Sequence, residues 1–345
     1  MNVTAKDALT ALIARRDLSR EEMLSVMQQI MSGEYTPVQI AGILVALRSK
    51  GETVTEIGAA ASVMRELSTK VSLGNPATLV DTCGTGGDGA HTFNISTASA
   101  FVAAAGGAQI AKHGGRSVSS TSGSADVLEA LGVNVNLTPE QVAECVNALG
   151  VGFMFAPNHH SAMRFAAPVR RELGVRTLFN LLGPLTNPAG ALNQVLGVFS
   201  RDWLRPLAEV LRDLGSRHVL IVHAEEGLDE ISLSGRTFIA ELKNGAVSEY
   251  TVSAGDFGLT PAPIESLAVH NVAEACSMLK NALQNTHRAA ADIVALNAGA
   301  ALYVAGKAAS LSDSIALAQQ IIASGAGLAK LDGLVALSQR FNESK

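Results

Sequence analysis

Several features that would narrow the function of this chain are scarce in its sequence. Only three cysteines occur, Cys83, Cys145 and Cys276, and none lies in a Cys-x-x-Cys pair, so neither a disulfide framework nor a zinc site is expected. Acidic residues outnumber lysine and arginine, and the net charge is −5 at pH 7. No overall attraction to nucleic acid or to anionic lipid is therefore expected.

Long hydrophobic runs are also missing. Charged residues interrupt every apolar run within residues 1–23 before it reaches the length of a signal-peptide core. The longest weakly polar run, residues 98–111, is shorter than the ~18 residues that cross a bilayer. We expect a soluble cytoplasmic protein without an export signal, and the length of 345 residues suggests two domains.

Residues 1 to about 67 carry apolar positions at helical spacing, and each stretch begins with a helix N-cap signal. The signals are Thr4, Ser19 with Glu22 as a capping box, Thr36 before Pro37, and Thr53 or Thr55. The pattern predicts a small all-helical N-terminal domain of four helices.

From residue 77 onward, short apolar runs alternate with helical patterns. The predicted strands are ATLVD, AQIAK, VNVN, VGFMFAP, NQVLGVFS and RHVLIVHA. Such alternation predicts an α/β fold with a mostly parallel central sheet flanked by helices. Around Asn244 and Gly245 the period falls to two, which predicts a hairpin near the edge of the sheet, and the chain should be helical again from about Val272.

A glycine-rich segment, CGTGGDGAHTFNIST at residues 83–97, follows the first predicted strand and precedes an apolar helix. In an open α/β sheet, ligands bind beyond the carboxyl ends of the strands, where helix N-termini present free N–H groups. Glycine permits positive φ and the close approach of a phosphate, and Asn94, Ser96 and Thr97 add donors and a helix cap. The segment therefore predicts an anion site, since a plain turn needs fewer glycines.

Two nucleotide-binding motifs fit this segment less well. Gly84, Gly86 and Gly89 satisfy Gly-x-Gly-x-x-Gly, but the next strand ends in AKHGGR and not in the acidic residue that would hold a ribose. No Lys-Ser or Lys-Thr pair follows the glycines, as a Walker A motif requires. A dinucleotide-dependent oxidoreductase is thus a weak alternative.

The loop after the second strand, AKHGGRSVSSTSGSADVLEALG, is basic and rich in serine. It combines Lys112, His113 and Arg116 with Ser117, Ser119, Ser120, Ser122 and Ser124. This composition predicts a second anion-binding loop, adjacent to the first. A flexible surface loop would explain the serines but not the cationic end of the strand.

Acidic residues follow a later strand, in VLIVHAEEGLDEIS. Asp229 and Glu230 could together hold one or two Mg²⁺ ions through water, with help from Asp88 or Ser96. The alternative is an acidic loop that is merely solvated.

Residues 158–173, NHHSAMRFAAPVRREL, read as a helix interrupted by Pro168. His160, Met163, Ala167 and Arg170 would share one face of that helix. An arginine among apolar and histidine neighbours suits the planar carboxylate of an aromatic ligand, although solvent-exposed arginines would give the same pattern.

On these strings the chain resembles the anthranilate phosphoribosyltransferase family of tryptophan biosynthesis. GTGGDGAHTFNIST, KHGGRSVSSTSGSADVLEALG, VRRELGVRTLFNLLGPLTNPAG and GLDEIS occur in the order and spacing of the family, and the resemblance runs essentially end to end. It implies Mg²⁺-dependent transfer of the phosphoribosyl group of phosphoribosyl pyrophosphate (PRPP) to the amine of anthranilate. It also implies a homodimer joined through the helical domain, with no nucleic-acid or membrane partner.

The resemblance further implies domain boundaries and site residues. A helical domain of residues 1–70, completed by helices around 165–190, would join an α/β domain of residues 75–163 and 191–345. PRPP would be bound by Gly84, Gly87, Asp88, Thr92, Asn94, Ile95, Ser96, Thr97, Lys112, His113, Gly114, Gly115, Arg116, Ser117, Ser119 and Ser120. Anthranilate would contact Gly84, Gly115, Pro157, His160, Met163 and Arg170, with its carboxylate on Arg170, and the metal ligands would be Ser96, Asp229 and Glu230.

One residue departs from the family pattern. The family usually reads Lys-His-Gly-Asn-Arg, whereas this chain has Gly115, so one polar contact to the acceptor is missing or replaced. Two other functions stay open. A pyrimidine nucleoside phosphorylase of similar fold should continue the glycine loop differently and need no acidic pair, and a non-enzymatic nucleic-acid-binding relative would need a basic face.

Overall fold

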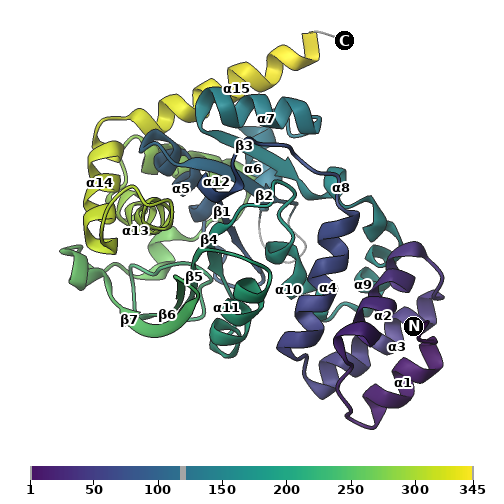
Figure 1. The fold of residues 1–345 in the computed structure, drawn as a ribbon. Helices are drawn as coiled ribbons and strands as arrows, with labels where there is room; N and C mark the ends of the chain where they lie inside the picture. The colour runs from purple at the N-terminus through teal and green to yellow at the C-terminus, as the bar shows by residue number, and fades with distance from the viewer. Residues whose placement is uncertain (1, 117–121, 344–345) are drawn as a thin grey trace.

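The computed structural model describes residues 2–116 and 122–343. A bundle of helices at the N-terminal end of the chain lies beside a central sheet, which is covered by further helices (Figure 1). The C-terminal helix α15 (Ala326–Glu343) lies on the far side of the molecule from this bundle (Figure 1).

The four N-terminal helices begin at the expected caps. They are α1 (Ala5–Ile13), α2 (Arg20–Ser32), α3 (Pro37–Lys50) and α4 (Val54–Leu67). The hydroxyls of Thr4, Ser19, Thr36 and Thr53 each accept a hydrogen bond from a backbone N–H of the following first turn. These N–H groups have no partner inside the helix, so a capping hydroxyl fixes where each helix starts. The predicted four-helix module is confirmed.

The central sheet has seven strands in the order β3-β2-β1-β4-β5-β6-β7. The strands are β1 (Leu79–Gly84), β2 (Gln109–Gly114), β3 (Val151–Phe155), β4 (Asn193–Gly197), β5 (His218–Ala224), β6 (Thr237–Lys243) and β7 (Ala246–Val252). The first five pair in parallel, and β6 and β7 are antiparallel at one edge. Asn244 and Gly245 form the hairpin turn with φ of 55° and 78°. The mostly parallel sheet and the edge hairpin are both confirmed.

The strand predicted for VNVN, residues 133–136, is absent, so that prediction is wrong. Val133 and Val135 are buried, which explains the apolar alternation in the sequence. The N–H of Asn134 donates to Ser338 Oγ at 3.0 Å, and the N–H of Asn136 donates to Asn134 Oδ1 at 2.9 Å. Side chains thus take the backbone donors that a sheet ladder would need.

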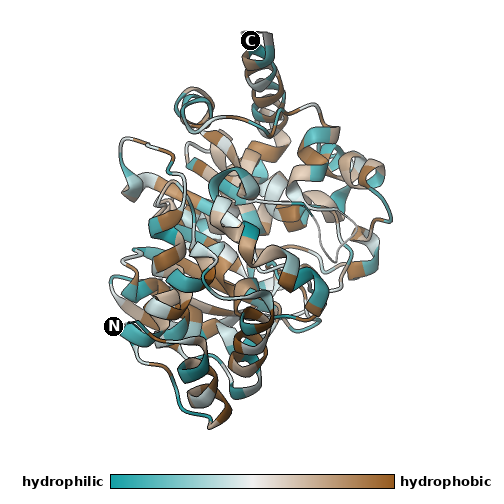
Figure 2. Ribbon diagram, turned by 90° about the vertical axis from the view of Figure 1, so that its right-hand side faces the viewer, coloured by the Kyte–Doolittle hydropathy of each residue, from teal (hydrophilic) through white to brown (hydrophobic). Residues whose placement is uncertain are grey.

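Helices cover both faces of the sheet. On one face lie α5 (Ile95–Ala105), α6 (Ser124–Ala130), α7 (Pro139–Leu149), α12 (Val272–Leu283), α13 (Arg288–Val304) and α14 (Leu311–Ala323), and on the other lies α11 (Leu204–Asp213). Along β5, Leu220 and Val222 join the first core while Val219 and Ile221 join the second. The second core is continuous with the core of the helical bundle. Hydrophobic and hydrophilic stretches alternate along the helices (Figure 2).

Across the described ranges, no single helix is both long and apolar enough to cross a membrane. Only the pair α14 and α15, joined across a bend of 68°, reaches that length and composition.

The chain passes between the bundle and the sheet three times. After α4 it enters β1, and after β3 it returns to the bundle as α9 (Ala167–Leu173) and α10 (Leu178–Leu182) before β4. The crossings are bonded to one another: the N–H of Thr69 donates to the carbonyl of His159 at 2.8 Å, and His159 Nδ1 lies 2.9 Å from the carbonyl oxygen of Thr69. The N–H of Val71 donates to the carbonyl of Pro188 at 3.2 Å.

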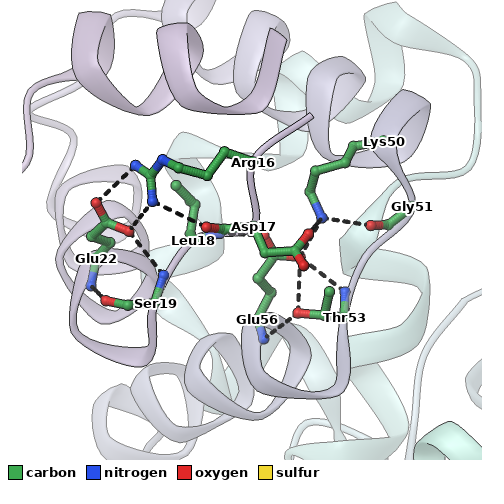
Figure 3. Close-up of polar contacts among 9 residues, drawn as sticks. All are labelled: Arg16, Asp17, Leu18, Ser19, Glu22, Lys50, Gly51, Thr53 and Glu56. Carbon is green, nitrogen blue, oxygen red and sulfur yellow. Dashed lines mark hydrogen bonds and ion pairs between the residues drawn. The ribbon is translucent and has the colours of Figure 1, made fainter. Parts of the chain in front are cut away.

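A buried ion pair joins α3 and α4 in the bundle (Figure 3). Lys50 Nζ lies 3.0 Å from Glu56 Oε2 and 2.7 Å from Asp17 Oδ1, and the Glu56 side chain is fully buried. Glu56 also accepts hydrogen bonds from the N–H groups of Leu18 and Thr53, both at 2.9 Å. Both oxygens of this carboxylate therefore accept hydrogen bonds, and together these contacts join three segments of the bundle.

Candidate functional site

The predicted site lies at the carboxyl ends of the central strands. From β1 the chain proceeds through β2 and β3 on one side, while β4 and β5 lie on the other side of β1. The strand order therefore reverses between β1 and β4, and such a switch point is where ligands bind in open α/β sheets. The glycine loop follows β1, and the acidic loop follows β5, so both reach this edge.

The glycine loop depends on backbone conformations that favour glycine. Gly86, Gly87 and Gly89 have φ of 65°, 75° and 75°. At Gly84 a Cβ atom would lie 2.4 Å from Asp229 Oδ2, and at Gly197 it would lie 1.6 Å from the carbonyl oxygen of Asp229. Two strand ends thus need glycine because the acidic loop packs directly onto them, a reason that is independent of phosphate.

Asp229 and Glu230 both contact the glycine segment, from 143 and 134 positions away in the sequence. Asp229 Oδ2 accepts a hydrogen bond from the N–H of Gly86 at 2.9 Å, and Glu230 Oε1 accepts one from the N–H of Ser96 at 3.1 Å. The predicted metal ligands Ser96, Asp229 and Glu230 are therefore brought together.

The electrostatics of this pair are unfavourable for two charges. Burial, and then the negative charge of Asp88, raise the pKa of Asp229 to about 7. Burial, and then the charge of Asp229, raise the pKa of Glu230 to about 8. Removing a carboxylate from water and placing it beside another both disfavour ionisation, so the surrounding charges do not fully compensate this pair.

Lys112 is the basic residue closest to this centre. It is buried at the end of β2, and its Nζ donates to the carbonyl of Thr82 and, at 3.2 Å, to Ser96 Oγ. Lys112 lowers the pKa of Glu230 and so offsets part of the repulsion there. The predicted neighbourhood of Lys112, Ser96 and Glu230 is present.

Asp81 was missed as a site residue by sequence reasoning. It is buried in β1, where its carboxylate accepts hydrogen bonds from Asn187 Nδ2 at 2.8 Å and from the N–H of His113 at 3.1 Å. Asn187 Nδ2 also donates to the carbonyl of Ala111 at 2.9 Å. The sequence did contain a signal for Asp81. This ionisable residue ends the apolar run ATLVD, and a carboxylate that is buried with such a run needs hydrogen-bond partners.

The basic loop is only partly described. Ser117, Ser119 and Ser120 lie outside the described residues. Arg116 is paired with Asp126 at 2.9 Å and with Glu129 at 2.6 Å on α6, so its guanidinium is directed to that helix. Gly114 ends β2 against Ser124, whereas a side chain at Gly115 would meet no atom within 4 Å.

Asn94 was expected to help cap α5, and this expectation is wrong. It occupies the N-cap position but its side chain makes no capping bond. Its amide instead exchanges hydrogen bonds with Ser122, with Nδ2 donating to the carbonyl at 3.2 Å and Oδ1 accepting from the hydroxyl at 3.0 Å. Asn94 thereby links the glycine loop to the basic loop.

The remaining predicted donor residues line the same segment. Thr92 forms an isolated antiparallel bridge to Ala268. Ile95 and Thr97 are buried, and the Thr97 hydroxyl has no hydrogen-bond partner among the described residues. Asp88 Oδ1 accepts from the N–H of Ala90 at 3.2 Å, which leaves its other oxygen toward Asp229.

The predicted acceptor residues do not share one long helix, so that prediction is wrong. The segment forms α8 (Ala156–His159), a 3₁₀ turn (Ser161–Phe165) and α9, with Pro157 and Pro168 in the first turns of the two helices. His160, whose φ of −122° and ψ of 58° are neither helical nor extended, separates α8 from the 3₁₀ turn. A proline cannot continue a preceding helix, which accounts for the break.

Three buried histidines lie where this segment meets β2. The rings of His113 and His160 are 5.1 Å apart, so His113 faces the acceptor segment. Burial lowers the pKa of His113 to about 3 and that of His160 to about 4, and it also lowers the pKa of His159. All three rings are therefore neutral at pH 7.

Arg170 lies on α9 as expected for a ligand to an anionic acceptor. Its Cζ is 5.3 Å from the centre of the Phe179 ring, and burial lowers its pKa, so the charge is partly withdrawn from water. Met163 is half-buried on the 3₁₀ turn beside it. No ion pair of Arg170 occurs within the part of the chain that the structure describes.

The described residues contain no group of three or more His, Cys, Asp or Glu side chains arranged to hold a metal ion by themselves. Mg²⁺ keeps several waters and is usually bound by one or two carboxylates together with substrate phosphates. A pair of half-buried, mutually repelling carboxylates beside an anion loop fits that kind of site.

Two family models match the chain. The a/b domain of a glycosyl transferase family matches residues 76–328, and the helical bundle domain of a glycosyl transferase family matches residues 6–68. The chain is 60% identical over 98% of its length to the anthranilate phosphoribosyltransferase of Methylobacillus flagellatus, 99% of which is covered. It is 59% identical over 99% of its length to that of Thiobacillus denitrificans, which is covered completely.

Solved structures agree with these relatives. The crystal structure of anthranilate phosphoribosyltransferase from Thermus thermophilus matches with a TM-score of 0.91 and 46% identity, covering 96% of this chain and 99% of that one. The Saccharomyces cerevisiae enzyme in complex with PRPP and Mg matches with a TM-score of 0.82 and 25% identity, covering 98% and 94%.

Proposed function

The chain belongs to the anthranilate phosphoribosyltransferase family, and we propose that the loops after β1, β2 and β5 bind its sugar donor. The protein transfers the 5-phosphoribosyl group of PRPP to the amine of anthranilate, giving N-(5-phosphoribosyl)anthranilate and pyrophosphate in tryptophan synthesis. The observation that carries the residue assignment is the meeting of Asp229 and Glu230 with the backbone of the glycine segment.

Two kinds of group form the donor site: hydrogen-bond donors for the phosphates, and carboxylates for the ribose hydroxyls and the metal. The N–H groups of the glycine loop and α5 face the phosphates, together with Ser96, Thr97 and the serines of the basic loop. Asp88 accepts from the ribose hydroxyls or from hydrated metal. Asp229, Glu230 and Ser96 hold Mg²⁺, and this ion supplies positive charge to the pyrophosphate when bound. The raised pKa values of the two carboxyls support this assignment, because a cation would relieve the repulsion.

Catalysis then depends on positioning and charge. Lys112 places a buried cation beside Ser96, where it stabilises charge that builds on the departing pyrophosphate. Arg170 holds the anthranilate carboxylate, and Gly84, Gly115, Pro157, His160 and Met163 line the acceptor. Because the rings of His113 and His160 are neutral, no cation competes with Arg170 for the carboxylate. The aromatic amine is thus held in line with the anomeric carbon.

The assay that tests this proposal follows the fluorescence of anthranilate. We expect the signal to fall only when PRPP and Mg²⁺ are both present, and a pyrimidine nucleoside with phosphate to give no turnover. Gly115→Asn should fold, since a Cβ at this position meets no atom within 4 Å among the described residues, and we expect a lower KM for anthranilate than in the wild type. Loss of anthranilate without PRPP would contradict the donor assignment.

The assembly, domain roles and location are further parts of the proposal. Residues 1–70 with the helices around 165–190 form the helical domain, and residues 75–163 with 191–345 form the α/β domain, in a cytoplasmic enzyme. Val38 and Val45 on α3 and Ile13 at the end of α1 are exposed, at 81%, 44% and 75%, which supports a homodimer through this domain. Light scattering should give twice the 35.7 kDa chain mass, and a monomer would contradict the dimer.

A further inference from the structure

Arg176 contacts the glycine loop from the helical side of the molecule. Its Nη2 donates a hydrogen bond to the carbonyl oxygen of Gly87. Its Cζ lies 4.3 Å from the centre of the Phe199 ring, so the guanidinium is stacked on an aromatic face. We propose that Arg176 is a positioning residue that sets the conformation of the glycine loop for PRPP, an inference that rests on the proposed function.

The position of Arg176 is set by the elements around it. It lies between α9, whose C-cap Gly174 has φ of 64°, and α10, where the N–H of the N-cap Thr177 donates a hydrogen bond to Asn180 Oδ1 at 3.0 Å. The Phe199 that it stacks on follows β4, and the N–H of Phe199 donates to Thr85 Oγ1 at 3.1 Å. Arginine, ring and loop therefore form one connected unit.

The loop needs such a contact because its glycines permit several conformations. Gly86 and Gly87 both have positive φ, and glycine reaches either sign of φ at little cost. In a trans peptide the carbonyl and the following N–H point in opposite directions. Holding the Gly87 carbonyl on Arg176 therefore directs the N–H of Asp88 away from the guanidinium, where it can serve as a donor.

Two side chains hold the loop, and only one of them has another proposed role. Asp229 accepts from the N–H of Gly86 but is also a proposed metal ligand, so the metal competes for it. Arg176 forms no ion pair within residues 2–116 and 122–343, which leaves its charge at the loop uncompensated by a carboxylate. A cation that is not neutralised also favours a phosphate nearby.

The contact also joins the two substrate regions. Arg170, proposed to hold the acceptor, and Arg176 lie on the same α9–α10 segment. A Cβ at Gly87, where φ is 75°, would lie 3.2 Å from Arg176 Nη2, so a larger residue would strain the loop and press on the guanidinium. A movement of the segment would therefore reach the acceptor site and the donor loop together.

The test compares Arg176→Gln with Arg176→Lys and with Arg171→Gln, which removes the same charge from an exposed position on α9. For Arg176→Gln we expect the KM for PRPP to rise about tenfold or more, as for loss of one charged hydrogen bond, and the KM for anthranilate to change less than about twofold. Arg176→Lys should recover part of the loss, and Arg171→Gln should match the wild type.

A second measurement separates positioning from folding. Isothermal calorimetry of PRPP binding to the same variants should show the same ranking, with melting temperatures within about 2 °C of wild type. If Arg176→Gln does not fold, Phe199→Leu takes its place, since it removes only the stacking surface, and it should raise the KM for PRPP alone. Unchanged PRPP binding in these variants, or equal rises in both KM values, would overturn the inference while wild-type turnover leaves the proposed function intact.

Discussion

The buried carboxylate Glu56 and the half-buried pair Asp229 and Glu230 differ in their partners. Glu56 in the helical bundle accepts hydrogen bonds from two backbone N–H groups and pairs with Lys50 at 3.0 Å (Figure 3). Asp229 and Glu230 at the sheet edge receive one backbone hydrogen bond each and face other carboxylates. The Glu56 carboxylate is compensated within the chain, whereas Lys112 offsets only part of the repulsion around Asp229 and Glu230.

This difference separates a structural site from a binding site without reference to relatives. Burial of a carboxylate is costly in both places, and only full hydrogen bonding or an opposite charge offsets that cost. Where the chain itself supplies those hydrogen bonds or that opposite charge, removal of the carboxylate should lower the stability of the fold. Where it does not, removal should harm function and leave the fold intact.

The largest expected effect is on turnover. The double variant Asp229→Asn, Glu230→Gln should lower kcat by about 10³-fold or more in Mg²⁺, because the charge that holds the metal at the pyrophosphate is lost. Stability at pH 8 should be unchanged or higher, since two repelling charges are removed. Steady-state kinetics and urea unfolding measure the two quantities.

Neutralising another carboxylate of the same loop is the control for the double variant. Glu225→Gln removes an exposed carboxylate that pairs with Arg236 at 2.7 Å, so turnover should stay near that of the wild type. Normal kinetics in the double variant would contradict the metal assignment.

The next effect is on stability. Glu56→Gln should lower the free energy of unfolding by about 3 kcal/mol, because Lys50 and the N–H of Leu18 lose a charged partner in the interior. Glu52→Gln is the control, since the Glu52 side chain is equally buried but neither oxygen accepts a hydrogen bond within the described chain. That variant should stay within about 1 kcal/mol of wild type in urea. Equal losses of unfolding free energy in Glu56→Gln and Glu52→Gln would contradict the structural role given to Glu56.

The smallest expected effect is a dependence of stability on pH. Asp229 and Glu230 have raised pKa values in the folded state, so the folded protein binds more protons than the unfolded one and stability falls as pH rises. The contribution is complete below about pH 4 and lost through about pH 8. Between pH 7.5 and 8.5, where the buried histidines are neutral in both the folded and the unfolded state, metal-free protein should lose on the order of 1 kcal/mol.

Thermal or urea unfolding across this pH range measures the slope. Millimolar Mg²⁺ should reduce it, and the double variant should show a nearly flat profile. A wild-type profile that rises over this interval would contradict the pKa directions.

Much of this fold could be predicted from local signals. The caps Thr4, Ser19, Thr36 and Thr53 act within one helical turn, so their sequence pattern is enough to place the helices. The turn at Asn244 and Gly245 is equally local. The glycine segment and the acidic pair were also recognisable as parts of a site from their residue types.

The failures came from partners distant in sequence. The run at residues 133–136 looked like a strand, but Ser338 takes the Asn134 N–H. The ion pairs of Arg116 with carboxylates of α6 were likewise not expected from the sequence. Asp81 and Arg176 received no role from the sequence, because their contacts with Asn187 and with the glycine loop are made only in the folded chain.

The triple passage of the chain between bundle and sheet limits how this protein can be divided. A fragment starting near residue 75 would still contain α9 and α10, whose apolar sides pack against the missing bundle. A fragment ending near residue 70 would lack those two helices. Neither half is a continuous module, so truncation or domain exchange at the first crossing should yield insoluble material. To exchange the helical domain, two separate stretches of the gene would have to be replaced at once.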